Sequence, residues 1–414
     1  MLRREFLKSA GGAAVASWLP LFTFAGRPDA LPHYAEMAAR LKSAATIDPA
    51  DYAARRDRLQ TLLVERHLAG LFCEPGVNSA YFTGYQTGRS ERVIALFIPA
   101  KGEPLVISPA FEEERVRNES GFQKIYVWEE DESPYALVGR VLGDLGVRSG
   151  SIAIEPTTRY FVADKLAHEV PQLQLINGEA LCDELRMRKS EKELALMRLS
   201  LDATEACIRQ TWTQMKSGMR EQEVAKLLSQ NYSGLGLTGG GLIQFGASAA
   251  IPHGGPGGKP LEANQIVLMD CGTRVKGYTS DITRTTVFGT ASSRHEAIWQ
   301  LVHQAQTAGI EAAKPGVACE TVDAAARKVI SDAGYGQYFT HRLGHGIGLE
   351  GHEAPYFARG NKTILQTGMT LTVEPGVYIP GEFGVRLEDD IVITQDGCEL
   401  LTHRMSHIEP IGGA

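Results

Sequence analysis

Residues 265–287 read QIVLMDCGTRVKGYTSDITRTTV, and this stretch decides which kind of fold the chain can adopt. It opens with a nearly continuous apolar run that closes on Asp270, which is typical of a strand buried on both faces. The β-branched residues within 278–287 predict a second strand. A hairpin whose centre directly follows Val275 would place Asp270 opposite Asp281, with Cβ atoms about 4.5–5.5 Å apart.

The same arrangement recurs further along the chain. Residues 370–379 read TLTVEPGVYI and residues 383–392 read FGVRLEDDIV, with the strong turn signal Pro-Gly between them. Centring this hairpin on the glycine of the turn places Glu374 opposite Glu388. Pro375 cannot donate a ladder hydrogen bond, so we expect an edge or a bulge there.

Two pairs of opposed carboxylates are costly unless they are protonated or neutralised by a cation. The alternative interpretation, solvated surface acids, fits poorly because VLMD and LTVE each place the acid at the end of an apolar run. Strand periodicity also places Tyr378 on the face of Glu374, and Arg386 on the face of Glu388. Four oxygen donors on two ribbons suit two divalent cations that share ligands.

A glycine-rich segment supplies nitrogen donors, which shift the preference toward transition metals. Residues 341–352 read HRLGHGIGLEGH, so three histidines fall within twelve positions, in the part of the sequence between the two pairs of carboxylates. Glycine lets the backbone approach a metal or a substrate closely. Histidines without such a context are expected to be structural: His33, His67, His168, His295, His303, His403 and His407.

Length and composition fit two ordinary domains. The chain has 414 residues and 43% hydrophobic content, enough for two cores. A formal net charge of -7 argues against a nucleic-acid partner, which usually requires a basic face. Helix and strand patterns predict a smaller α/β domain over residues 27–185 and an α+β domain over residues 186–414. A capping box, Ser190 with Glu193, marks the start of a helix expected to run to about Gln214.

The N-terminus predicts export to the periplasm. Residues 1–26 combine a charged start, a modest apolar core and small residues near the end, as in a secretory signal. Arg3 and Arg4, followed by Phe-Leu-Lys, resemble a twin-arginine signal, and a frayed amphipathic helix is the alternative. No apolar run in the body reaches about 18 residues, so we expect no membrane-spanning helix there. The six cysteines form no C-x-x-C pair and are expected in the core.

Several segments carry motifs of one known family. Residues 78–85 (NSAYFTGY) look like its N-x-x-Y-L-T-G-Y strand, and residues 185–190 look like its interdomain linker. Residues 270–285 match D-x-G…G-Y-x-S-D-x-T-R-T, residues 344–353 match G-H-G-I-G-L…H-E, and the V-E-P-G and R-x-E-D segments follow. The chain thus resembles the pita-bread metallopeptidases with a creatinase-like N-terminal domain, which include Xaa-Pro aminopeptidases and Xaa-Pro dipeptidases (prolidases). The resemblance implies an α+β pita-bread catalytic domain behind a smaller α/β domain.

The resemblance also implies a site for two divalent metal ions, with Mn²⁺ first and Co²⁺ or Zn²⁺ as alternatives. The implied metal ligands are Asp270, Asp281, His345, Glu374 and Glu388, of which Asp281 and Glu388 would bridge the metals. The implied catalytic residues are Glu374, His253, His352 and Arg386. The implied substrate contacts are His341, His253, His352 and Tyr378. Thr283 would support the metal ligands from behind.

The implied reaction is hydrolysis of the Xaa-Pro bond, at the N-terminus of peptides or in Xaa-Pro dipeptides, by a hydroxide that bridges the metals. Glu374 would pass the proton to the leaving nitrogen. The expected partners are a proline-containing peptide and further copies of the chain in a homodimer or higher homo-oligomer. Two alternatives stay open: another metal-dependent hydrolase or lyase on this fold, and a non-catalytic peptide-binding module. The sequence does not decide between aminopeptidase and dipeptidase.

Overall fold

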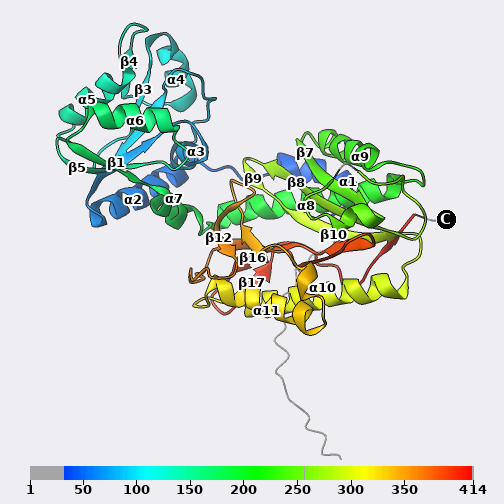
Figure 1. The fold of residues 1–414 in the computed structure, drawn as a ribbon. Helices are drawn as coiled ribbons and strands as arrows, with labels where there is room; N and C mark the ends of the chain where they lie inside the picture. Colours follow the sequence, from blue (N-terminus) through cyan, green and yellow to red (C-terminus); the bar gives the residue numbers. More distant parts are fainter. Residues whose placement is uncertain (1–31, 256, 413–414) are drawn as a thin grey trace, which may run out of the picture.

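The computed structural model describes residues 32–255 and 257–412 of the chain. Figure 1 shows two lobes. The chain passes from one to the other between α7 (Glu179–Arg186) and α8 (Glu191–Gln214). The predicted export signal, residues 1–26, lies outside the described residues. Helices and strands are mixed in both lobes, which agrees with the predicted fold class.

A six-stranded sheet forms the core of the first domain. Its strands are β1 (Leu68–Cys73), β2 (Ala95–Pro99), β3 (Leu105–Pro109), β4 (Ile125–Trp128), β5 (Gly150–Ile154) and β6 (Leu173–Asn177). The order is β4-β3-β2-β1-β5-β6, antiparallel among β1 to β3 and parallel at both ends. Because strand side chains alternate, Leu71 and Cys73 enter one hydrophobic core and Phe72 enters the other.

Helices cover both faces of this sheet. They are α2 (Pro49–Glu65), α3 (Val77–Thr83), α4 (Glu113–Ser120), α5 (Pro134–Asp144), α6 (Tyr160–Glu169) and α7. Leu59 of α2 and Leu181 of α7 pack into the core with Leu71, whereas Leu137 of α5 and Val162 of α6 pack on the opposite face.

One expectation for this domain is wrong. Residues 78–85 were predicted to form a strand, but the chain forms helix α3 over Val77–Thr83. The Ser79 hydroxyl lies 2.9 Å from the Gly76 backbone nitrogen at the start of the helix, and Gly84 ends it with φ of 76°. A left-handed residue after the last turn is a common helix stop, and glycine adopts that conformation at little cost.

The second domain is built from long helices and curved sheets. Its helices are α8, α9 (Glu221–Gly234), α10 (Ser293–Ala312) and α11 (Cys319–Asp332). Its strands are β7 (Gly239–Phe245), β8 (Gln265–Val275), β9 (Tyr278–Thr279), β10 (Ile282–Phe288), β11 (Gly344–Gly346), β12 (Glu353–Phe357), β13 (Thr370–Val373), β14 (Gly376–Ile379), β15 (Phe383–Arg386), β16 (Asp389–Ile393), β17 (Cys398–Leu400) and β18 (Pro410–Ile411).

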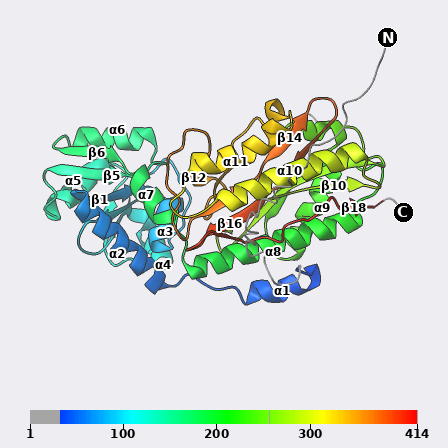
Figure 2. The ribbon, with the colours of Figure 1, turned by 90° about the horizontal axis from the view of Figure 1, so that it is seen from below.

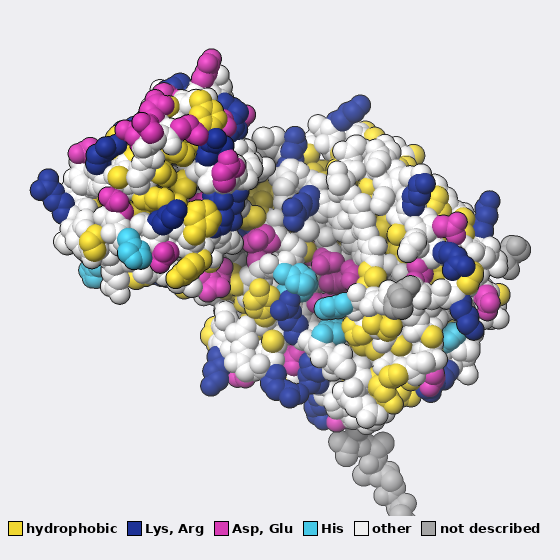
Figure 3. Space-filling model, turned by 45° about the horizontal axis from the view of Figure 1, so that its top comes forward, with side chains coloured by type: hydrophobic (Ala, Val, Ile, Leu, Met, Phe, Trp, Pro, Cys, Tyr) yellow, Lys and Arg dark blue, Asp and Glu magenta, His cyan; other side chains and the backbone are white. Residues whose placement is uncertain are grey.

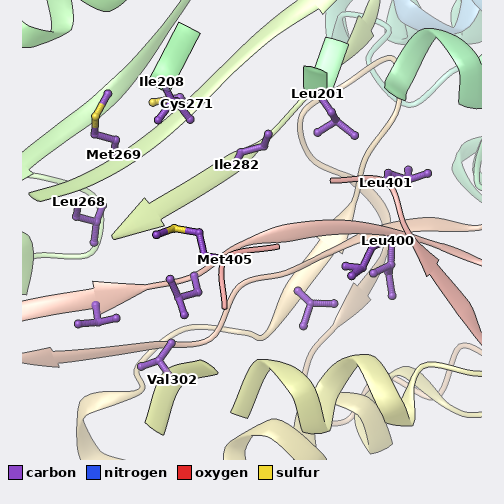
Figure 4. Close-up of a cluster of buried hydrophobic side chains, with 14 of the residues drawn as sticks. Leu201, Ile208, Leu268, Met269, Cys271, Ile282, Val302, Leu400, Leu401 and Met405 are labelled. Atoms are coloured by element: carbon purple, nitrogen blue, oxygen red, sulfur yellow. The ribbon is translucent and has the colours of Figure 1, made fainter. Parts of the chain in front are cut away.

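These strands form two larger sheets and a hairpin. The sheet orders are β18-β10-β8-β7, with β9 paired to β8, and β12-β11-β13-β16-β17, while β14 pairs with β15. Helices α8 and α9 lie on one side of the strands and α10 and α11 on the other (Figure 1). Figure 4 shows one region of the core, where Leu201 and Ile208 of α8, Met269 of β8 and Val302 of α10 contribute buried side chains.

The predicted helix start between the domains is confirmed. Ser190 caps α8, its backbone nitrogen donates to Glu193 Oε2 at 2.9 Å, and the Glu193 nitrogen donates to Ser190 Oγ at 3.4 Å. The helix ends at Gln214, as expected.

The first helix of the described chain belongs with the second domain. Residues 27–185 were predicted to form one domain, yet α1 (Tyr34–Lys42) lies along α8 (Figure 2). Met37 is fully buried in the core of the second domain, and the Tyr34 hydroxyl donates to the Asn231 carbonyl at 2.6 Å. The α1 side chains find an apolar partner surface there, which short-range sequence patterns do not reveal.

Five of the six cysteines are buried, Cys398 is half-buried, and all six are free thiols. Among the described residues, no helix combines the length and the apolar character that a membrane span requires.

Candidate metal centre

The first pair of predicted ligands lies on and beside β8, in a register that differs from the predicted one. Asp270 pairs with Thr283 across β8 and β10, not with Asp281. The hairpin turns at Lys276 and Gly277, which have φ of 50° and 91°, so its centre lies one residue later than expected. Each residue therefore pairs two positions further along the partner strand. A shift of two keeps side chains on the same face, so Asp270 and Asp281 still converge.

The second pair follows the predicted register. Val373 pairs with Asp389 and Gly376 pairs with Arg386, so the same register runs on both sides of Glu374 and Glu388. The ladder is interrupted between these pairs, where Pro375 cannot donate. The expected irregularity at this proline is confirmed.

His345 joins the carboxylates from β11, where its side chain is almost fully buried. Its Nε2 atom lies 3.5 Å from Glu374 Oε1 and 3.8 Å from Asp281 Oδ2. Its Nδ1 atom lies 3.1 Å from the Gly346 carbonyl oxygen, which can only accept, so Nδ1 carries the proton. The Nε2 lone pair therefore faces the carboxylates, as in a metal ligand. Burial, together with His352, lowers the pKa of His345 to about 3, so the ring is neutral.

The five predicted ligands form one group. Donor atoms within 4.8 Å of one another occur in three overlapping sets: Asp270, Asp281 and Glu388; His345, Glu374 and Glu388; Asp281, His345 and His352. Figure 3 shows histidine side chains beside an acidic patch in a hollow near the junction of the two lobes.

Electrostatics indicate that this group suits cations. Burial first, and then the neighbouring carboxylates, raise the pKa values of Asp281 and Glu374 well above the ordinary range. The same causes raise the pKa of Glu388 to about 8. The carboxylates therefore repel one another when all are ionised, and bound divalent cations relieve that repulsion. Four carboxylates and one imidazole are donors that suit two such ions.

A hydrogen-bond network holds the carboxylates in place. Arg386 donates from Nη2 to Asp270 Oδ2 at 2.6 Å and from Nε to Thr283 Oγ1 at 3.0 Å. The Thr283 hydroxyl donates to Glu388 Oε2 at 2.7 Å. Arg386 also donates from Nη1 to the Tyr378 hydroxyl at 2.9 Å. The predicted proximity of Tyr378 and Arg386 to the acids is confirmed, and both side chains orient groups at the site.

His341 contacts Tyr378, but its nitrogens already have partners. Nδ1 lies 2.7 Å from the Arg342 carbonyl oxygen and so donates to it, while Nε2 accepts from the Tyr378 hydroxyl at 2.8 Å. Burial, despite that carbonyl contact, lowers the pKa of His341 to about 4, so the ring is neutral. What His341 can offer a substrate is therefore the surface of its ring.

His352 and His253 lie at the rim. The His352 ring centroid is 3.8 Å from that of His345, and Arg342 Nη2 donates to His352 Nδ1 at 3.1 Å. Since Nδ1 accepts, Nε2 carries the proton and is free to donate. His253 is exposed in the turn that follows residues 246–250, close enough to help lower the pKa values of His341 and His352.

Arg342, which contacts His352, was not among the predicted site residues. Its guanidinium also lies over the Tyr356 ring, 4.4 Å from the centroid. The signal was present in the chain, because Arg342 is the only cation between the histidines of HRLGHGIGLEGH. Its role depends on which way the loop turns, and spacing alone does not give that.

A second acidic group has no need of a metal. Donor atoms of Asp202, Glu205 and His403 also lie within 4.8 Å of one another. However, Arg284 Nη2 donates to Glu205 Oε1 at 2.7 Å, and His403 Nδ1 lies 2.6 Å from Glu205 Oε2. Side chains of the protein therefore neutralise this group.

Comparisons with known proteins agree with this geometry. Residues 195–395 match the metallopeptidase family M24, and residues 55–188 match the creatinase/prolidase N-terminal domain. The putative dipeptidase YkvY of Bacillus subtilis is 34% identical over 352 residues, which cover 84% of this chain and 97% of that protein.

Solved structures give the same result. Dipeptidase PepE from Mycobacterium ulcerans has a TM-score of 0.83 at 30% identity, over 89% of this chain and all of that one (100%). The Xaa-Pro dipeptidase from Bacillus anthracis has a TM-score of 0.77 at 30% identity, over 87% of this chain and 99% of that one.

Proposed function

The chain belongs to metallopeptidase family M24, with a creatinase/prolidase N-terminal domain, and on this premise we propose that it hydrolyses the Xaa-Pro bond of short peptides. The enzyme class follows from the family. The proline preference is supported by the similarity to an Xaa-Pro dipeptidase and to prolidases of solved structure. Because several relatives are named dipeptidases, we propose that the substrates of this chain have two residues. Longer peptides with proline in the second position are the alternative.

The observation that carries the proposal is the convergence of four mutually repelling carboxylates and one neutral imidazole. We propose that these donors hold two divalent ions, with Asp281 and Glu388 shared between them: Asp270, Asp281, His345, Glu374 and Glu388. When bound, such a pair lowers the pKa of a water molecule and polarises the peptide carbonyl. We propose Mn²⁺ as the native metal, with Co²⁺ or Zn²⁺ as alternatives.

The protein's own side chains then manage protons and charge. Glu374 is 15% exposed, so its carboxylate can accept a proton from water and pass it to the leaving nitrogen. His352 Nε2 can donate to the negative oxygen that develops at the carbonyl, and we assign His253 a supporting part in the same role. Arg386 and Thr283 keep Asp270 and Glu388 oriented toward the site.

The substrate's proline ring needs an apolar wall. His341 is partly exposed and its nitrogens are engaged, so its ring can offer an apolar surface, which the buried Tyr378 ring supports from behind. A saturated ring packs well on such surfaces, and it brings no amide hydrogen that would need a partner. We assign the proline side of the bond to this pair.

The test is a substrate panel with added Mn²⁺. Xaa-Pro dipeptides, Xaa-Pro-Xaa tripeptides and matched Xaa-Ala dipeptides are compared, and EDTA treatment followed by return of metal is the control. We expect cleavage of the proline substrates, loss with EDTA and recovery with Mn²⁺. Equal cleavage of Xaa-Ala and Xaa-Pro would refute the proline assignment, and metal-independent cleavage would refute the metal site.

We also propose that the chain is exported by its twin-arginine-type segment and that it assembles as a homodimer or higher homo-oligomer. Replacing Arg3 and Arg4 by lysine keeps the charge but removes the twin-arginine pair. The variant is expected to stay in the cytoplasmic fraction. Unchanged recovery in the periplasm would contradict the export proposal, and a single chain by light scattering would contradict the assembly.

A further inference from the structure

The segment that carries two histidines of the site is anchored at the border between the domains. His345 lies in β11 and His352 lies just before β12. Glu353 opens β12 directly after His352, and its side chain is 6% exposed. The carboxylate therefore points into protein while the neighbouring imidazole stays at the rim of the site.

Two cations from the end of the first domain and the linker converge on that carboxylate. Arg186, the last residue of α7, donates from Nη2 to Glu353 Oε2 at 2.5 Å. Lys189 donates from Nζ to Glu353 Oε1 at 2.6 Å. Burial alone would raise the pKa of Glu353, but Lys189 and Arg186 outweigh it and lower that pKa. The three side chains form a buried ion network that we call the border network.

The first domain holds the border network from behind. Arg186 Nη1 donates to Asn78 Oδ1 of α3 at 3.1 Å, and Asn78 Nδ2 donates to Glu155 Oε1 at 2.7 Å. Arg186 Nη2 also reaches the more exposed Glu350 at 2.7 Å. Buried, hydrogen-bonded charges of this kind favour one arrangement over others, because any displacement leaves a charge without its partner.

The glycine-rich backbone packs directly on the border network. A Cβ atom at Gly348 would lie 2.7 Å from both Glu353 Oε1 and Lys189 Cε. The neighbouring Leu349 packs against the cores of both domains. The segment between His345 and His352 is therefore held by the border network and the first domain as well as by its own domain.

We infer that Arg186 and Lys189 are positioning residues, which hold Glu353 and thereby aim His352 at the substrate. This inference rests on the proposed function, because it assigns the first domain a part in the same reaction. A rim histidine that must donate to a developing charge needs a fixed direction, since small misplacements lower the rate of the chemical step more than they weaken binding.

Glu353→Gln tests the inference, with Glu350→Gln as the matched control. Both variants remove one carboxylate that Arg186 contacts, but Glu350 is 39% exposed and leaves Glu353 in place. We expect Glu353→Gln to lower kcat by about 10–100-fold, as when an outer partner of a catalytic group is lost, with KM within about twofold. Bound metal per chain should stay at the wild-type value. Glu350→Gln should stay within about twofold in both kinetic constants.

A second variant covers the case in which Glu353→Gln fails to fold. Arg186→Lys keeps the charge but loses the planar fork, and we expect a smaller fall in kcat, about fivefold, again at constant KM and metal content. The inference would be overturned if every one of these two variants that folds had the wild-type kcat. A fall in kcat that is matched by loss of metal would overturn it too, because the network would then be structural. A wild-type enzyme without Xaa-Pro cleavage would refute the proposed function itself.

Discussion

Two acidic groups lie on opposite sides of β10 and the segment that enters β16, and they behave in opposite ways. Thr283 and Glu388 face the candidate metal centre, while the next residues along the chain, Arg284 and Asp389, face a group around Glu205. Burial would raise the pKa of Glu205, but His403 and Arg284 lower it. At the metal centre, burial and mutual repulsion raise the pKa of Glu388 to about 8.

The difference teaches how to tell a metal centre from a salt bridge. Both groups contain buried carboxylates, and in both the donor atoms lie close enough together to hold a metal ion. What separates them is whether the protein supplies the compensating positive charge. On one face of β10 and β16 it does so through Arg284, and on the other face the acids outnumber the single guanidinium of Arg386 that contacts Asp270.

The largest expected effect is at Asp281. Asp281→Asn keeps the shape but removes a negative charge from the metal centre, so we expect activity to fall by at least about 1000-fold, beyond the 10–100-fold loss of an outer partner. Bound metal should fall below the wild-type amount, as measured by inductively coupled plasma spectrometry. If Asp281→Asn kept its full metal content and full activity, the proposal that this group, unlike the group around Glu205, needs a metal would be wrong.

The reciprocal change is Glu205→Gln. It leaves the positive charges of the neighbouring group partly uncompensated, so we expect a loss of about 3 kcal/mol in the free energy of unfolding, measured in urea. Metal content should not change. Loss of metal from this variant, with stability retained, would mean that the second group binds a metal as well.

The pH dependence of stability should have opposite signs in the two groups. Without metal, folded Glu388 holds its proton up to about pH 8, whereas in the unfolded chain it loses it near 4.5. The unfolded state therefore binds fewer protons in this window, and the unfolding free energy of the metal-free protein should fall as pH rises from about 4.5 to 8. Glu205, with its lowered pKa, contributes stability that is lost as pH falls below the ordinary value.

Urea titrations of EDTA-treated protein between pH 5 and 8 check this expectation. Glu388→Gln is the matched control and should flatten the slope. Added metal should displace protons at pH 7, which calorimetry in two buffers can count. A metal-free stability that rises with pH over this window would contradict the assigned charge imbalance.

The smallest effect is expected at Arg342. Burial and the charge of Arg342 together lower the pKa of His352, so Arg342→Gln should raise that pKa while His352 keeps its place. A histidine titration by NMR measures the change, and kcat/KM should fall by less than about tenfold. Arg342→Lys, which keeps the charge, should leave the pKa nearer to the wild-type value. If the pKa of His352 were unchanged in both variants, Arg342 would not influence His352 in the proposed way.

Sequence patterns predicted which carboxylates converge, because an error of two positions in strand register leaves a side chain on the same face of the sheet. An error of two positions in the first hairpin moved Asp281 along the partner strand but kept it on the same face, whereas an error of one would have removed it. The second hairpin was correct because Pro-Gly fixes its turn. Turn chemistry also explains the first error, since Lys276 adopts a positive φ that favours glycine or asparagine more than lysine.

Other features depend on contacts between distant parts of the chain. Residues 78–85 have the apolar content of a strand, but buried partners on α2 and α7 and the stop at Gly84 favour a helix. The engagement of both His341 nitrogens and the donation from Arg342 to His352 require the folded loops. Local patterns carry no information about which side chain fills which hydrogen-bonding position.

Helix α1 changes the meaning of a domain boundary in this chain. Because α1 packs on α8, the described part of the chain begins in the second domain, crosses to the first at α2, and returns through α7 (Figure 2). The first domain is thus inserted within the second and is connected to it by two segments of the chain rather than by one linker. After a protease cut between residues 187 and 190, the packing of α1 on α8 would still hold the two fragments together. A truncation that begins at Pro49 would remove α1 and therefore part of the core of the second domain.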